Sequence, residues 1–303
     1  MEEMIPLLCV IFGMSCVGTS SFGKINSNVL SGASRAKYSL YLIIVGAFAC
    51  FFFWLFSGLS IKVNLPTLIF AFFFALVVAS ATVLRMIAFG LASVSGVNII
   101  MSGSNIICSL LVGALLFSEE ITFLKIVRAL IMIASISLTF FETNKGERSE
   151  TGIKDRKNGV KLFFVMMLII VTCCAETVVM KLFTLDKRVS DDNSFFFLTN
   201  LLLAIGCIAI VAFDLIRKRE SIDNIRHLFK PKRLSCFLGF TFSANLGSIA
   251  SIGMVALLDV SVYTPMTAAL GIISGLVSSI IFKEKLGWAS YLAAAIAVVA
   301  VII

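Results

Sequence analysis

Long apolar runs alternate with short polar connections along this whole chain. A helix needs about 20 apolar residues to cross about 30 Å of hydrocarbon, and many of the runs have this length. They predict spans at 5–23, 39–57, 66–89, 95–117, 121–141, 160–182, 194–214, 234–257, 261–282 and 287–303. Two of the divisions lie inside nearly continuous apolar stretches, where GLASVSG (90–96) and LLDVS (257–261) supply turn residues. The pattern therefore predicts ten transmembrane helices.

The composition supports this prediction. Hydrophobic residues make up 59% of the 303 residues and charged residues only 14%, which is too little polar surface for a water-soluble globule of this size. We therefore expect an all-α integral membrane protein. The first run follows Glu2 and Glu3 instead of a basic stretch, so we expect a permanent helix there and no removable signal peptide.

The end of each half of the chain carries the same pattern. Residues 88–138 match residues 253–303 at a constant offset of 165, most clearly at FSEEITF (117–123) and FKEKLGW (282–288). This predicts a first five-helix repeat at 1–144, a basic linker at 145–159 and a second repeat at 160–303. Because five is an odd number, the second repeat enters the membrane from the opposite face. Inverted repeats of this kind are typical of secondary transporters, with the substrate near the midplane of a central cavity.

Basic residues gather in alternate connections, which predicts the orientation. Lys24, Arg35 and Lys37 follow the first span, and similar groups follow the fifth, seventh and ninth. Positive connections favour the cytoplasmic side, so we expect both termini on the non-cytoplasmic side of the cell (plasma or inner) membrane. The basic segments are too short to form a nucleic-acid-binding domain, and no nucleic-acid partner is expected.

The two repeats also carry a family resemblance. Phe117-Ser118-Glu119 and Phe282-Lys283-Glu284 stand at corresponding helix turns, each followed by an apolar and an aromatic residue. Together with ten helices in two inverted halves, this resembles the drug/metabolite transporter superfamily, specifically its EamA-like family. The resemblance implies a transporter of small metabolites or amphipathic compounds, often outward. The commoner family pattern has Gly before the motif Glu, where this chain has Ser118 and Lys283, so the subfamily stays open.

Polar residues at helical spacing are the candidates for substrate contact. Asn98, Ser102, Asn105 and Ser109 share one face of the 95–117 span. The matching positions in the second repeat are Tyr263, Thr267, Leu270 and Ser274. Ser15 and Thr19 in the first span and Asn245 in the eighth are further candidates. These residues line a cavity or, alternatively, form interhelical hydrogen bonds.

Charged residues inside the spans are the second group of candidates. Glu176 is the deepest carboxylate, and an offset of 157 aligns Ser15 and Thr19 with Thr172 and Glu176, and Lys24 with Lys181. Glu176 is predicted to couple proton movement or to bind a cationic group; the alternative is an ion pair with Arg85, Arg128 or Lys181. Arg85 either holds an anionic substrate or snorkels to the membrane surface. Glu119 and Glu284 are expected to cap the helices that follow them.

These observations favour a secondary active transporter that works by alternating access, with export as the expected direction and protons or exchange as the driving force. A lipid-carrier flippase and a transport-inactive membrane partner are the alternatives. An enzyme is not expected, because no paired carboxylates, His cluster or nucleophile with a base is present. The cysteines are expected to serve as apolar core residues, and no metal, redox centre or cofactor is predicted. Gly271 and Gly275 allow close helix packing within a monomer or, alternatively, in a homodimer.

Overall fold

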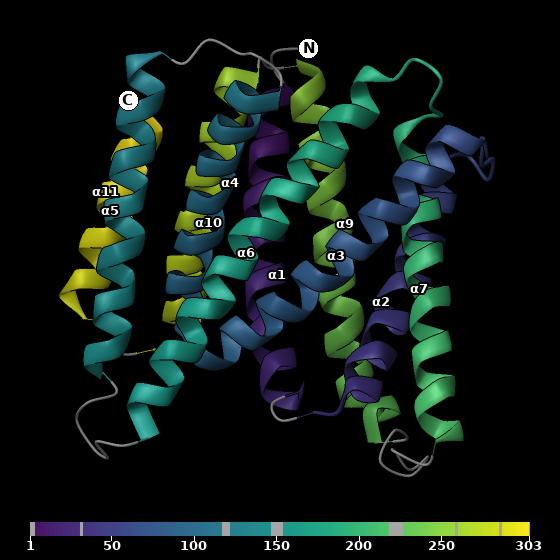
Figure 1. Ribbon diagram of the computed structural model, residues 1–303, viewed down its shortest axis with the longest axis horizontal. Coiled ribbons are helices and arrows are strands. Elements are labelled where there is room, and N and C mark those ends of the chain that lie inside the picture. The colour runs from purple at the N-terminus through teal and green to yellow at the C-terminus, as the bar shows by residue number, and fades with distance from the viewer. Residues whose placement is uncertain are drawn as a thin grey trace.

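The chain forms a bundle of long helices (Figure 1). The structure, a computed structural model, describes residues 4–30, 33–116, 122–146, 154–217, 227–257, 260–284 and 287–302. Within these ranges it is entirely helical apart from turns and connections. The helices are α1 (Met4–Leu30), α2 (Arg35–Phe56), α3 (Leu65–Leu91), α4 (Val94–Leu116), α5 (Phe123–Gly146), α6 (Lys154–Leu185), α7 (Asp192–Ile216), the 3₁₀ turn η2 (His227–Phe229), α9 (Pro231–Leu257), α10 (Val260–Ile281) and α11 (Trp288–Ile302).

Several of these helices have the length and composition of membrane spans. In the described part of the chain, six apolar segments are long enough to cross a bilayer: α1, α2, α3, Val160–Met180 within α6, α7, and Pro231–Ser251 within α9. The helices α4, α5, α10 and α11 contain shorter apolar stretches. The expectation of an all-α membrane protein is therefore confirmed.

The helix boundaries agree with most of the predicted spans. Both predicted breaks are confirmed, because α3 ends at Leu91 before α4 begins at Val94, and α9 ends at Leu257 before α10 begins at Val260. The predicted end of the first span at residue 23 is wrong, since α1 continues to Leu30. Its last turns are buried at Asn26, Ser27 and Leu30, so packing stabilises a helix that the apolar pattern alone would end earlier.

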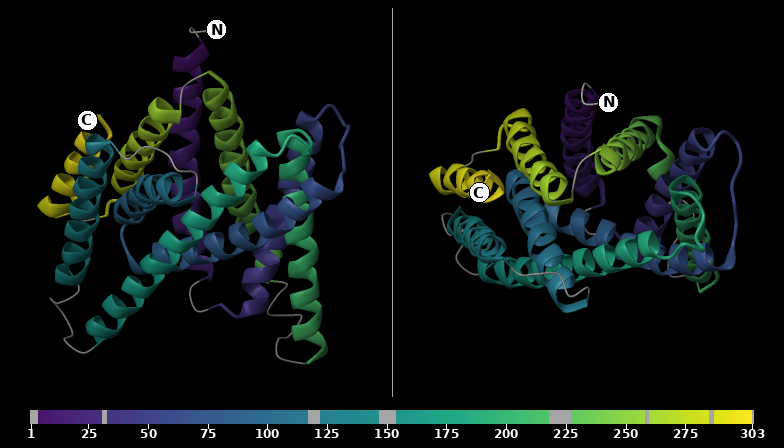
Figure 2. Two further views of the ribbon diagram at one scale, coloured as in Figure 1. Left: turned by 45° about the horizontal axis from the view of Figure 1, so that its top comes forward. Right: turned by 90° about the horizontal axis from the view of Figure 1, so that it is seen from above.

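The two predicted halves are interleaved. The most extensive helix contacts join α1 to α9, α2 to α7, α3 to α6, α4 to α10 and α5 to α11. Each of these pairs takes one helix from residues 1–146 and one from residues 154–302. Figure 2 shows the α5/α11 pair at one end of the bundle and the α2/α7 pair at the other, with α1 between them. The halves therefore share one packed bundle and are not separate domains.

Connections that follow odd-numbered spans lie near one another, and so do connections that follow even-numbered spans. Arg35 at the start of α2 bonds Asp214 near the end of α7 through its Nε, at 3.1 Å from Oδ2. At other connections, the Asn64 amide donates to the Arg188 carbonyl oxygen at 2.7 Å, and the Ser190 N–H donates to Thr67 Oγ1 at 2.8 Å. The α1–α2 connection is thus beside the end of α7, and the α2–α3 connection is beside the α6–α7 connection.

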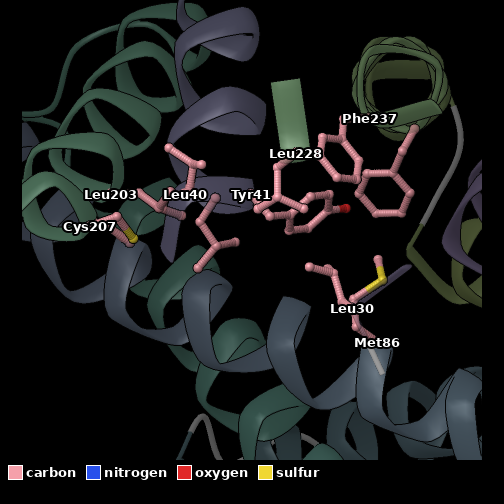
Figure 3. Packing of buried hydrophobic residues seen from close by; sticks show 11 residues of the cluster. Leu30, Leu40, Tyr41, Met86, Leu203, Cys207, Leu228 and Phe237 are labelled. Carbon is pink, nitrogen blue, oxygen red and sulfur yellow. The ribbon is translucent and has the colours of Figure 1, made fainter. Parts of the chain in front are cut away.

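Aromatic and aliphatic side chains fill the region between α1, α2, α3, α7 and α9. Tyr41 is fully buried there and meets Phe237 edge to face, with ring centroids 4.9 Å apart (Figure 3). Leu30 and Met86 pack in the same cluster. On α3, by contrast, Phe72 and Phe73 are exposed and only Phe74 of that run is buried, as expected for a helix with one face toward lipid.

The α4–α10 contact depends on glycine. A Cβ atom added to Gly275 would lie 2.8 Å from Cβ and Nδ2 of Asn98, and one added to Gly271 would lie 2.8 Å from Ser102 Oγ. Farther along the same contact, the Ser95 N–H donates to Ser279 Oγ at 2.9 Å. The Gly-x-x-x-Gly pair thus serves packing inside the chain, with polar side chains of α4 seated against it.

Gly275→Ala is expected to destabilise the fold by about 1 to 3 kcal/mol, because the added methyl group has no space beside Asn98. Gly206→Ala in α7 is the matched control, since a Cβ there meets no atom within 4 Å and alanine favours a helix by up to about 1 kcal/mol. Unfolding of both purified variants in detergent would compare them. Equal stability of the two variants would contradict the packing described for Gly275.

Candidate functional site

Arg85 on α3 is a charged residue at a junction of helices. Its side chain lies near Cys16 on α1, Tyr41 on α2 and Glu176 on α6. The Nε atom of Arg85 is buried and has no hydrogen-bond partner. A charge among apolar helices is costly, and such residues usually face the interior of the bundle or a water-filled cavity.

Glu176 is a carboxylate within the apolar segment Val160–Met180 of α6. It is partly buried, and Arg85 is the charged side chain that interacts with it electrostatically. Among the described side chains, the salt bridges are Lys24–Glu284, Arg35–Asp214 and Arg188–Asp186. The predicted ion-pair alternative is therefore wrong for Arg85 and Arg128, which make no contact ion pair with Glu176. The third proposed partner, Lys181, has a side chain outside the described set.

The polar residues of α4 do not form the single lining predicted for them. Asn98 is 9% exposed and its Nδ2 donates to Ser20 Oγ on α1 at 2.8 Å. Ser102 is buried against Gly271, and Asn105 is exposed. Asn98 and Ser102 therefore fit the alternative of interhelical packing, whereas Asn105, on the same face of α4, is exposed. The side chains of Ser109 and Tyr263 lie outside the described set, and Thr267 is partly buried on α10.

The remaining polar candidates lie on α1 and α9. Ser15 and Thr19 satisfy their hydroxyl groups within α1, donating to the carbonyl oxygens of Phe12 and Ser15 at 2.7 and 2.8 Å. Asn245 on α9 is buried, and its Nδ2 has no hydrogen-bond partner. Of these three residues, Asn245 has the free donor that a polar ligand group would use.

Lys24, Ser279, Glu284 and the α3–α4 break form what we call the Lys24–Glu284 cluster. Lys24 Nζ lies 3.3 Å from Glu284 Oε1 and donates to the carbonyl oxygens of Phe89 and Ala92 at 2.8 and 3.1 Å. Glu284 Oε2 accepts from the Val94 N–H and from Ser279 Oγ, both at 2.9 Å. The two side chains are only 20% and 16% exposed.

Each charge in this cluster matches the helix end that it meets. The ammonium group of Lys24 lies at the carbonyl end of α3, which carries partial negative charge, and the carboxylate of Glu284 lies at the N–H end of α4, which carries partial positive charge. The cluster thus joins α1, the α3–α4 break and the end of α10 at one place.

Two sequence predictions are corrected by this cluster. Lys24 was placed in a cytoplasmic connection, but it lies inside α1 because Glu284 and two carbonyl groups stabilise its charge there. Glu284 was expected to cap the helix that follows it, but it caps α4 from the other half of the chain. The repeat matches Lys24 with Lys181 and Glu284 with Glu119, but no sequence signal indicates that Lys24 and Glu284 lie together. Glu119, the counterpart of Glu284, lies outside the described residues.

Sulfur chemistry departs from the sequence prediction at one residue. Cys174 on α6 is disulfide-bonded, a bond that the sequence does not predict. Among the described residues, no three His, Cys, Asp or Glu side chains gather as metal ligands.

The fold and its apolar spans define a polytopic α-helical membrane protein. No family model matches the chain, and no curated protein matches its sequence.

Proposed function

We propose that this protein is a secondary active transporter of the EamA-like type, which moves a small metabolite or amphipathic compound by alternating access. The observation that carries the proposal is the pair Arg85 and Glu176: an arginine and a carboxylic acid within apolar segments of α3 and α6, two helices that pack together, with no contact ion pair between the two described side chains. A charge within a membrane span costs about 2.5 to 3.5 kcal/mol, and such residues are typical of substrate or proton pathways. A substrate anion beside Arg85 and a proton or cationic group at Glu176 would use both charges.

The helix contacts support two exchangeable states. In the proposed repeat, α1 corresponds to α6, α3 to α9 and α4 to α10. The α1–α9 contact then corresponds to the α3–α6 contact, and the α1–α10 contact corresponds to the α4–α6 contact. All four contacts are present. An inverted repeat with paired contacts of this kind gives two conformations of similar energy, which open to opposite sides. In this proposal, the Lys24–Glu284 cluster holds α1 to α10 in one conformation, and its bonds break in the other.

Counterflow into proteoliposomes tests the proposal. Vesicles containing the purified protein would be preloaded with a pooled library of amino acids, nucleosides, organic acids and amphipathic cations, and entry of labelled members would be compared with protein-free vesicles. We expect one chemical class to enter faster with the protein present. Absence of flux for every class, in protein shown to be folded, would contradict transport; movement of labelled lipids in the same vesicles would favour a flippase.

A further inference from the structure

Three sulfur atoms from three helices meet near one end of the bundle. Cys9 Sγ on α1 lies 3.6 Å from Met266 Sδ on α10 and 3.9 Å from Met254 Sδ on α9. Cys9 is five residues after the start of α1, Met254 three before the end of α9 and Met266 six after the start of α10. Met254 is fully buried, whereas Cys9 and Met266 are partly exposed. The group is therefore within about 10 Å of the helix ends and is not sealed.

Hydrogen bonding does not explain this arrangement fully. A thiol has one proton and serves one acceptor at a time, and thioether sulfurs are weak acceptors. Methionine is also a common filler of irregular core space, but packing alone does not require both thioether sulfurs to face one thiol. The two distances from Cys9 Sγ, 3.6 and 3.9 Å, are close to those that a shared ligand would give, since a metal bonded to three sulfurs at about 2.3 Å holds them about 3.8 to 4.0 Å apart.

The donor set selects the kind of metal. Thiolate and thioether ligands favour soft ions such as Cu(I), whereas Mg²⁺, Ca²⁺ and Mn²⁺ favour oxygen ligands. The charge of the donor set also favours a monovalent ion. One thiolate and one monovalent cation are neutral together, whereas a divalent ion would leave an uncompensated charge among apolar helices.

We propose that Cys9, Met254 and Met266 bind a soft monovalent cation, Cu(I) or its analogue Ag(I). On binding, the Cys9 S–H bond breaks, its proton passes to solvent and three sulfur–metal bonds form. No electron is transferred. The ion would link α1 to α9 and α10, and this inference does not depend on the proposed transport function.

Competition for Cu(I) tests the site. The full-length protein in detergent would be titrated without oxygen into the coloured Cu(I) complex of bicinchoninate, and the loss of colour would report Cu(I) taken by the protein. We expect the wild type to take one equivalent. Cys9→Ser and Met266→Leu are each expected to weaken binding about tenfold or more, because each removes a direct ligand.

Two control variants separate this site from general thiol or thioether binding. Cys50→Ser removes a thiol whose Sγ faces the Phe197 carbonyl oxygen, at 3.5 Å, and Met14→Leu removes an exposed methionine of α1. Both are expected to bind Cu(I) like the wild type. Ag(I) should also raise the unfolding temperature of the wild type and of both controls, and should raise that of Cys9→Ser less.

Either of two results would overturn the proposal: a wild type that takes no Cu(I) from bicinchoninate, or Met266→Leu with unchanged affinity. Met266→Leu conserves volume and is expected to fold, so it decides the question even if Cys9→Ser does not fold.

Discussion

Glu284→Ala is expected to lower the free energy of unfolding by about 2 to 4 kcal/mol. This value lies between the usual cost of losing a helix cap and the usual cost of breaking a fully buried ion pair. The variant removes the acceptor of the Val94 N–H and leaves the Lys24 ammonium, which is only 20% exposed, without its carboxylate. Unfolding in mixed detergent micelles, followed by intrinsic fluorescence, would measure the loss.

Two further variants separate charge from hydrogen bonding in this cluster. Glu284→Gln keeps an oxygen that can accept from Val94 and Ser279, so a smaller loss than for alanine is expected. Lys24→Met should also destabilise, since two carbonyl groups lose their donor. Lys232→Met, at an exposed lysine on α9, is the control and should have no effect. If Glu284→Ala cost no more than Lys232→Met, the role assigned to the cluster would be wrong.

Arg85→Ala is expected to raise the KM for transport about tenfold to a hundredfold, the range for losing a hydrogen bond to a charged group. In the proposed site, the free Nε and the positive charge of Arg85 serve an anionic group of the substrate. Arg85→Lys retains the charge but loses the planar fork of donors, so an intermediate KM is expected. Initial rates of counterflow at a series of substrate concentrations would measure both.

Arg128 supplies the matched control for Arg85. Its Nε is also buried without a hydrogen-bond partner, but it lies on α5, which contacts α6 less extensively than α3 does. Arg128→Ala is therefore expected to leave the KM close to that of the wild type. An equal increase in KM for both alanine variants would indicate a general effect on the fold and would contradict the special position of Arg85.

The helices and their breaks could be predicted because apolar runs and turn residues are local features of the sequence. Residues 90–96 and 257–261 supply turn residues inside apolar stretches, and α3 and α9 end there. The end of α1 was missed because Lys24 reads locally as a polar stop. Its charge is stabilised by Phe89, Ala92 and Glu284, which are distant in sequence.

The candidate site was only partly accessible from sequence. Helical spacing puts Asn98, Ser102 and Asn105 on one face, but the neighbouring helix decides what covers that face. Gly271 and Gly275 bring α10 against Ser102 and Asn98, while Asn105 stays exposed. The depth of Glu176 could be read from the apolar run around it, but the absence of a contact ion pair with Arg85 depends on how α3 and α6 cross.

Substrate accumulation driven by an imposed pH gradient would show whether Glu176 couples transport to proton movement. Wild-type protein and Glu176→Gln would be reconstituted side by side, using the substrate class found by counterflow, with and without the gradient. We expect the wild type to accumulate substrate in response to the gradient and Glu176→Gln to lose this response, because a carboxamide has no acidic proton to release or take up near neutral pH. A Glu176→Gln variant that keeps the full rate and the full response to pH would contradict proton coupling through Glu176.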